Sequence, residues 1–145
     1  MITEQAADLV ARVRTVPALA LRVGLALGGQ QVDPNLIKVP LPAAWVMYLH
    51  DQVDEVPGAS SSPYLVPATQ VMLATFGIII YVPYISEADM LATQLPLLEL
   101  VIKAVKLGGG QAPSGFRWRY IGQKLQLVDS ARLAYEQQYT LNFPM

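Results

Sequence analysis

Residues 70–84 read QVMLATFGIIIYVPY, and this stretch decides the fold class expected for the chain. It is rich in β-branched and aromatic residues, and from residue 78 to Val82 it is apolar at odd and even positions alike. Successive side chains of a strand point to opposite faces, so a strand of this composition is buried on both sides. We therefore expect residues 70–84 to form the central strand of a sheet.

Further strands are expected before this segment. Large apolar residues occupy the odd positions of residues 19–27. Residues 44–51 place Trp45, Met47 and Leu49 on one side of a second strand. An alternation with period two is typical of strands, because one face is buried and the other is not.

The C-terminal third predicts the remaining strands. Residues 116–120 alternate aromatic residues with arginines, and a pair of strands is expected on either side of Asp129 and Ser130. From Arg132 onward the odd positions are mainly apolar and the even ones mainly polar. One face of this last strand is therefore expected in the core and the other in water.

Two helices complete the pattern. Thr3 is placed to cap a short amphipathic helix that ends before Pro17. Ser86 is expected to cap the main helix, which covers residues 87–107. Pro96 lies inside that helix and should bend or split it, because a proline removes one backbone hydrogen bond and clashes with the preceding turn.

Length and element order together predict one domain. A chain of 145 residues suits a single core, and its sequence contains no internal repeat. The expected fold class is α+β: a single domain over residues 1–145, with a mostly antiparallel sheet packed by one short N-terminal helix and one long central helix.

The charge content is low for a soluble domain. Only 14% of the residues are charged and the formal net charge is -1, whereas typical soluble domains carry about 25% charged residues. Part of the apolar surface is therefore expected in contacts between subunits. The near-neutral net charge gives no excess of basic residues, which tight binding to nucleic acid would need.

Neither a membrane span nor a secretion signal is expected. Residues 56–86 carry no charge, but only residues 71–85 are strongly apolar, and Gly77 and Pro83 interrupt them. A spanning helix needs about 20 apolar residues. Acidic residues lie near the N-terminus, where a signal peptide has basic ones, so no signal peptide is expected. This favours a protein made in a reducing cytoplasm.

Motifs for catalysis or ligand binding are not found in the sequence. The chain has no cysteine, and His50 is its single histidine, so no thiol nucleophile or cysteine-based zinc site is expected. On a strand, His50 and Asp51 would point to opposite faces. The glycines at 108–110 follow a helix instead of opening one, unlike those of a phosphate loop. No catalytic residue, cofactor or metal is therefore predicted.

Several segments occur in an order that matches a known family. They are a short N-terminal helix, PAAWVMYL at 42–49, the apolar strand at 71–82, the helix at 87–107, and a block at 116–143 with YIG at 120–122, LVDSARL at 127–133 and YE at 135–136. In these features, over nearly its whole length, the chain resembles the tail terminator proteins of long-tailed bacteriophages. It is most similar to the small ones found in phages and prophages of Gram-negative bacteria.

The resemblance implies a structural virion protein that forms a hexameric ring on the head-proximal end of the tail tube. Such a ring ends tube polymerisation and gives the head-tail connector proteins a docking surface, and DNA passes through it without specific binding. The resemblance also implies assembly in the host bacterial cytoplasm and a place in the neck region of the tail. A domain of this size is about 35–40 Å across, so six in a ring leave room for DNA.

A closed ring needs two different, complementary patches on each subunit. We expect Arg132, Glu136 and Gln138 to form part of one patch, because a face of mixed charge permits selective pairing. The same face is equally typical of solvated surface. The long loop at 53–68 is expected to be ordered only against a neighbouring ring, with these residues in contact: Pro57, Ser61, Pro63 and Tyr64.

Two other functions remain open. The nearer one is another ring component of the head-tail connector, which would share the low charge and the apolar surface. The other is a small ligand-binding or enzymatic α+β domain.

Overall fold

The computed structural model describes residues 2–25, 41–54, 71–108, 110–128 and 131–144. Within these ranges the elements are α1 (Ile2–Arg14), the 3-10 helix η1 (Pro17–Leu19), β1 (Val23–Leu25), β2 (Ala43–Asp54), β3 (Val71–Pro83), α2 (Glu87–Asp89), the π-helical turn η3 (Met90–Gln94), α3 (Leu95–Leu107), β4 (Arg119–Val128) and β5 (Arg132–Pro144).

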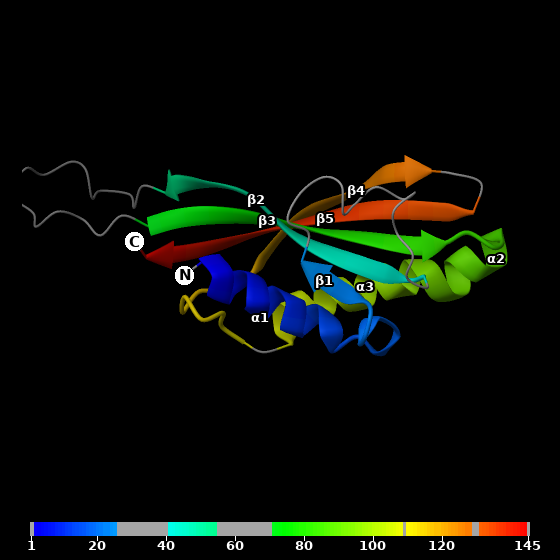
Figure 1. Cartoon of the computed structure of the whole chain (residues 1–145), viewed down its shortest axis with the longest axis horizontal. Coiled ribbons are helices and arrows are strands. Elements are labelled where there is room, and N and C mark those ends of the chain that lie inside the picture. Colours follow the sequence, from blue (N-terminus) through cyan, green and yellow to red (C-terminus); the bar gives the residue numbers. More distant parts are fainter. Residues whose placement is uncertain (1, 26–40, 55–70, 109, 129–130, 145) are drawn as a thin grey trace, which may run out of the picture.

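The strands form one sheet of five in the order β1-β2-β3-β5-β4. β1 pairs with β2 in parallel, and the other three neighbouring pairs are antiparallel. Figure 1 shows α1 and α3 running along one side of this sheet. The expected class, α+β with a mostly antiparallel sheet, a short N-terminal helix and a longer central one, is confirmed.

β3 lies in the middle of the sheet, as its composition predicts. Residues 74–82 are all buried, and the strand pairs with β2 on one side and with β5 on the other. Phe76 and Ile80 point into the main core under the helices. Ile79 and Tyr81 point the other way and form a smaller apolar cluster on the opposite face of the sheet. The strand is therefore buried on both sides.

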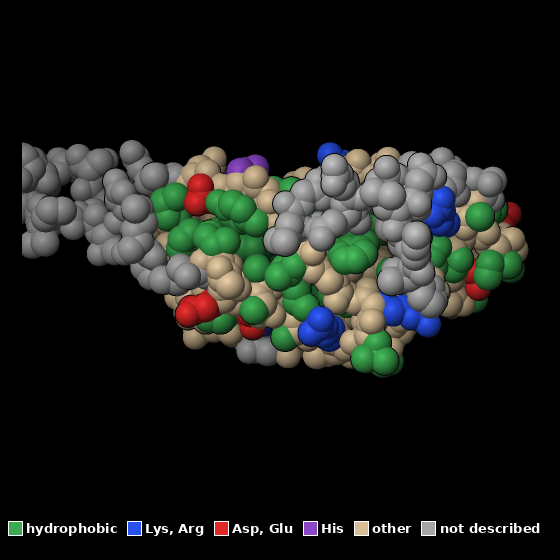
Figure 2. All heavy atoms as spheres, in the orientation of Figure 1, with side chains coloured by type: hydrophobic (Ala, Val, Ile, Leu, Met, Phe, Trp, Pro, Cys, Tyr) green, Lys and Arg blue, Asp and Glu red, His purple; other side chains and the backbone are tan. Residues whose placement is uncertain are grey.

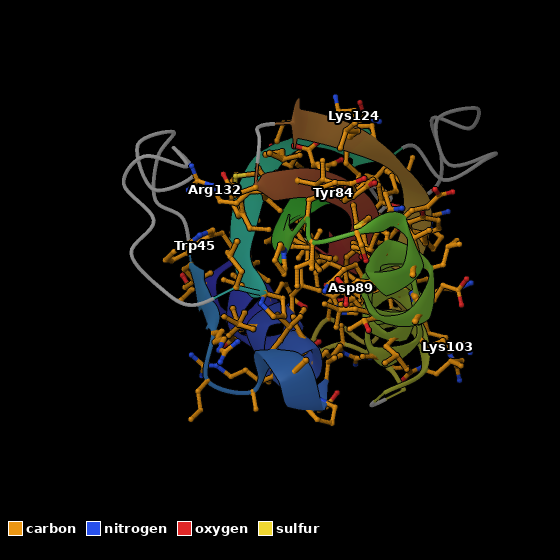
Figure 3. The ribbon with its side chains drawn as sticks, turned by 90° about the vertical axis from the view of Figure 1, so that its right-hand side faces the viewer. Trp45, Tyr84, Asp89, Lys103, Lys124 and Arg132 are labelled. Atoms are coloured by element: carbon orange, nitrogen blue, oxygen red, sulfur yellow. The ribbon has the colours of Figure 1, made fainter. Side chains whose placement is uncertain are left out.

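The main core fills the space between the sheet and the two helices. Seen along the long axis of the molecule, the sheet curves around α1 and α3 (Figure 3). α1 contributes the fully buried Leu9 and Val13, and α3 contributes the fully buried Val101 and Val105. Burying each such side chain stabilises the fold by about 1.5–3 kcal/mol, so amphipathic burial is what holds these helices against the sheet.

The main helix begins and divides where the sequence predicts. The Ser86 hydroxyl accepts a hydrogen bond of 3.1 Å from the backbone N–H of Asp89, which caps the first turn. Pro96 lies in the first turn of α3, where its missing N–H costs little. The turn before it, η3, is π-helical instead of α-helical. The predicted split at the proline is confirmed.

Two expectations near the N-terminus are wrong. α1 already begins at Ile2, so Thr3 lies inside its first turn and does not cap it. Residues 17–22 form a 3-10 helix and a turn instead of the start of a strand at residue 19, and β1 covers only Val23–Leu25. Pro17 has the fixed φ that suits the first turn of a helix. Of the alternating apolar residues, Leu19 is buried at the 3-10 turn and Val23 in β1, whereas Leu21 is 98% exposed.

The aromatic stretch at 116–120 is only partly a strand. β4 begins at Arg119, and a turn precedes it in which the N–H of Ala112 donates to the carbonyl of Phe116 at 2.8 Å. Phe116 is exposed, whereas Trp118 is buried. Phe116 lies before the strand, so the alternation of residues 116–120 does not belong to a single strand.

The even-numbered face of β5 is less exposed than the sequence suggests. Ala134, Glu136 and Thr140 are each at most 8% exposed. β5 lies between β3 and β4 and not at the edge of the sheet, so neighbouring strands flank it on both sides. The smaller apolar cluster, to which Ala134 belongs, lies on this same face. The expectation of a fully wet face is wrong.

A buried glutamine ties β5 to its neighbours. Gln137 is fully buried, and its Nε2 donates to the carbonyl of Leu98 at 3.0 Å and to Oε1 of Gln123 at 2.8 Å. Its Oε1 accepts from the hydroxyl of Tyr139 at 2.7 Å. This network joins α3, β4 and β5 through one side chain.

We expect the substitution Gln137→Leu to lower the free energy of unfolding by about 2–4 kcal/mol. Leucine keeps the volume but leaves the buried carbonyl of Leu98 and the buried hydroxyl of Tyr139, as well as the exposed Gln123, without this partner. Urea denaturation measures the loss as a lower midpoint with an unchanged slope. The control, Gln126→Leu, changes an exposed glutamine of β4 and should stay within about 0.5 kcal/mol. Equal midpoints for the two variants would contradict the role of the network.

Candidate assembly surface

The structure brings together two of the three residues expected in a subunit contact. Nε2 of Gln138 donates to Oε2 of Glu136 at 2.8 Å, and Nζ of Lys124 in the adjacent strand lies 3.8 Å from the same oxygen. Glu136 is 7% exposed, whereas the side chain of Lys124 is 64% exposed. Arg132 stands at the start of β5, opposite Pro83. Within the pair of Lys124 and Glu136, the accessible charge therefore belongs mainly to Lys124, a residue that the sequence analysis did not select.

A shallow hollow of about 190 Å³ lies beside these side chains on the outer part of the sheet. Its lining comes from β4 and β5: Ile121, Gly122, Gln123, Lys124, Glu136 and Gln138. A Cβ atom added at Gly122 would meet nothing within 4 Å. The glycine thus leaves the backbone of β4 open to an approaching chain.

Large apolar side chains are exposed on two other parts of the molecule. Leu91, Leu95, Leu100 and Leu107 of the η3–α3 helix are exposed, and so are the charged residues Glu99, Lys103 and Lys106. A groove of about 310 Å³ separates the end of this helix from the end of α1, and it is lined by Thr15, Val16, Pro17, Leu100, Lys103, Ala104, Leu107 and Gly108. The groove brings Leu100 and Leu107 together with Val16 and Pro17, and apolar side chains gathered at one place mark a contact site more often than isolated leucines do.

The charged and apolar side chains are unevenly spread over the face seen in Figure 2. Lysines and arginines lie toward the middle and right of that face, and the largest group of apolar side chains lies on its left. Acidic side chains are found toward both ends, and the single histidine lies in the upper part, left of the centre.

Two tyrosines have strongly shifted pKa values. Partial burial, and then the Asp51 carboxylate that accepts a hydrogen bond from the hydroxyl, raise the pKa of Tyr48 to about 12. Deep burial, and then the neighbouring Tyr120, raise the pKa of Tyr139 even further. Both hydroxyls therefore keep their protons at neutral pH and act as hydrogen-bond donors instead of bases.

Other site expectations have mixed outcomes. Across the described ranges, no group of three or more His, Cys, Asp or Glu side chains is placed to hold a metal. His50 pairs with Thr75 and Asp51 with Ala74, on opposite faces of β2, as expected. The loop residues expected to touch a partner lie outside the residues that the structure describes: Pro57, Ser61, Pro63 and Tyr64.

None of the helices within the described ranges combines the length and the hydropathy that crossing a membrane requires.

Comparison with known proteins gives a likeness in fold. No protein-family model matches the chain, and no curated protein matches it in sequence. Among solved structures, 33 chains match. One is a chain in a structure titled "Virion of native gene transfer agent (GTA) particle", with a TM-score of 0.50 and 14% sequence identity. The match covers 96% of the present chain and 86% of the other. At this identity the likeness shows a shared fold.

Proposed function

We propose that this protein is a structural component of a phage-type virion, and within that class a tail terminator. Six copies form a ring that caps the head-proximal end of the tail tube, ends its polymerisation and receives the head-tail connector proteins. The role is structural, with no catalysis or cofactor, and DNA passes through the ring without specific binding. The ring assembles in the host bacterial cytoplasm and stays in the neck of the particle.

The observation that carries this proposal is the agreement in fold, over 96% of the chain, with a chain of a gene transfer agent virion. The order of segments that resembles tail terminators supports the narrower assignment. A match confined to a short motif would say nothing of how the whole domain is used. Here nearly the whole domain corresponds.

The surface of the molecule supports assembly into a ring. A ring closes only through two different patches, related by a rotation that completes the circle. β4 presents the exposed side chains of Ile121 and Leu125 at one edge of the sheet. β2, with Tyr48 exposed, pairs with β1 only over Ala44–Val46 and lies toward the other edge. These two regions are different surfaces of the molecule, as a head-to-tail contact needs.

Electron microscopy and native mass spectrometry test the ring. The purified protein, incubated with its tail tubes, should form rings of six copies at one end of each tube and nowhere along its side. A monomer that leaves tube ends bare, both alone and in the mixture, would refute the proposal.

Deletion of the gene separates the terminator from a connector. Loss of a terminator should give headless tails of uncontrolled length, because nothing stops the tube from growing. Normal tails beside unattached heads would instead assign the protein to the head-tail connector. Intact particles in normal numbers would refute both roles.

A further inference from the structure

β4 forms an open edge of the sheet. It is the last strand in the order β1-β2-β3-β5-β4, and no other described strand pairs with its outer side. Arg119, Ile121 and residues 123–126 are all exposed. The outward N–H and C=O groups of an edge strand are a ready template for pairing with another chain. Soluble proteins commonly cover or shorten such an edge, yet this one is ten residues long.

Only one part of this edge is regular. The pairing of β4 with β5 shifts between Tyr120 and Gly122 and again between Leu125 and Leu127. Between the two irregularities, residues 122–125 pair in register with residues 135–138. Bulges bend a strand and limit how far a neighbour can pair. A docked strand would therefore meet about four residues, centred on Gln123 and Lys124.

The second half of β2 is the counterpart at the other side of the sheet. β1 pairs only with Ala44–Val46, so among described strands β2 has a neighbour on just one side beyond that point. Tyr48, His50 and Gln52 are all exposed. After a register shift between Tyr48 and His50, the strand is regular from residue 50 to 54.

The two edges carry opposite charge. Residues 116–128 contain Arg117, Arg119 and Lys124 and no acidic residue. Residues 43–54, by contrast, contain Asp51 and Asp54 and no lysine or arginine. Opposite charges facing each other across paired strands stabilise the pair, and like charges destabilise it. The β4 edge is thus complementary to the β2 edge and repels another β4.

The strand directions also agree with a ring. β2 and β5 both run antiparallel to β3, and β4 runs antiparallel to β5, so β4 and β2 run in opposite directions. A rotation about a ring axis leaves the sense of a strand along that axis unchanged. β4 of one copy would therefore meet β2 of the next in the antiparallel sense, and the alternation of the sheet would continue across the contact.

We propose that neighbouring copies of this protein join edge to edge, with residues 122–125 of β4 in one copy paired antiparallel to β2 of the next copy within residues 50–54. This proposal rests on the proposed ring and adds its subunit contact. The contact is head-to-tail, so it uses two different edges and can be repeated around the circle. A two-fold β4–β4 contact over residues 122–125 would bring the Lys124 side chains of both copies close together, which their like charge opposes.

The absence of cysteine from the chain provides a clean test. Cysteines are introduced singly at Gln123, Lys124 or Leu125 and singly at His50, Asp51 or Gln52, and then in all nine combinations of one from each strand. Directly opposed residues on paired strands are close enough for a disulfide, and nine combinations cover the neighbouring registers. After mild oxidation, denaturing gels without reductant report the links. The matched control combines Lys124→Cys with Glu99→Cys, an exposed position on α3.

At least one double variant should give a ladder of linked chains up to the size of the ring, while the control and the single variants give none. Mixing the two corresponding single variants should give linked pairs and nothing longer. Dimers from a single cysteine in β4 would show a two-fold contact and overturn the proposal. Rings seen by microscopy without a ladder from any double variant would also overturn it and leave the proposed function standing. Absence of rings in the unsubstituted protein, both alone and with its tail tubes, would instead refute the proposed function.

Discussion

Replacing Arg12 by methionine is expected to lower the free energy of unfolding by about 3–5 kcal/mol, as the removal of one partner from a buried ion pair does. Arg12 is 4% exposed, although it belongs to a surface helix. Its Nε lies 2.8 Å from Oδ2 of Asp8. The same carboxylate oxygen accepts from the indole N–H of Trp118 at 2.9 Å.

Carbonyl groups at the end of α3 and in the segment that follows it also contribute to the effect. The last carbonyls of a helix have no partner within it. Nη1 of Arg12 donates to the carbonyl of Val105 at 3.0 Å, and Nη2 donates to those of Gly110 and Gln111, each at 3.1 Å. One guanidinium therefore holds α1, the end of α3 and the segment that follows it. Methionine would leave these groups and Asp8 without that donor.

Thermal and urea denaturation measure the loss, with Arg117→Met as the matched control. Arg117 is an exposed arginine, and its replacement should change the stability by no more than about 0.5 kcal/mol. Arg12→Lys keeps the charge but not the planar fork of donors, and should fall between the two. A loss below about 1 kcal/mol for Arg12→Met would contradict the role of Arg12 in holding α1 against the end of α3 and the segment that follows it.

The sequence predicts those parts of the fold that depend on local pattern. The central strand is apparent at residues 70–84 because both faces are apolar, and the division of the main helix follows from the backbone chemistry of Pro96. The strand predicted from residue 19 was wrong at its start. A few alternating leucines arise equally from a 3-10 turn followed by a short strand. Period alone does not distinguish these cases over so few residues.

Contacts between distant segments could not be predicted from pattern. Arg12 binds carbonyls 93 to 99 residues further along the chain, and nothing near it in the sequence indicates this. The same limit applies to the candidate surface. The lack of acidic residues from 116 to 128 is visible in the sequence, but only the strand order places that segment at an edge. Glu136 was selected as a candidate contact residue because it lies on the polar face of the predicted last strand. In the structure β5 lies between two other strands, and the Glu136 side chain is largely buried.

A second large loss is expected for Phe76→Ala, again about 3–5 kcal/mol. Phe76 is fully buried in β3, the central strand of the sheet, whose sequence also indicates the fold class. Its ring packs edge-on against Trp118 at 5.3 Å between centroids and against Tyr48 at 5.5 Å. Alanine would remove the apolar volume and both aromatic contacts, each worth about 0.5–1.5 kcal/mol beyond the buried area.

Two further variants separate these contributions. Phe76→Leu keeps most of the volume without the ring, so its smaller loss in urea denaturation measures the aromatic contacts. Phe116→Ala, at an exposed phenylalanine, is the control and should cost less than about 1 kcal/mol.

Trp118 contacts both Phe76 and Asp8, the partner of Arg12. The losses from Phe76→Ala and Arg12→Met should therefore not add in the double variant, since residues that share a partner are coupled. Strict additivity would mean that the core under β3 and the anchor at the end of α3 are independent, contrary to the contacts that join them.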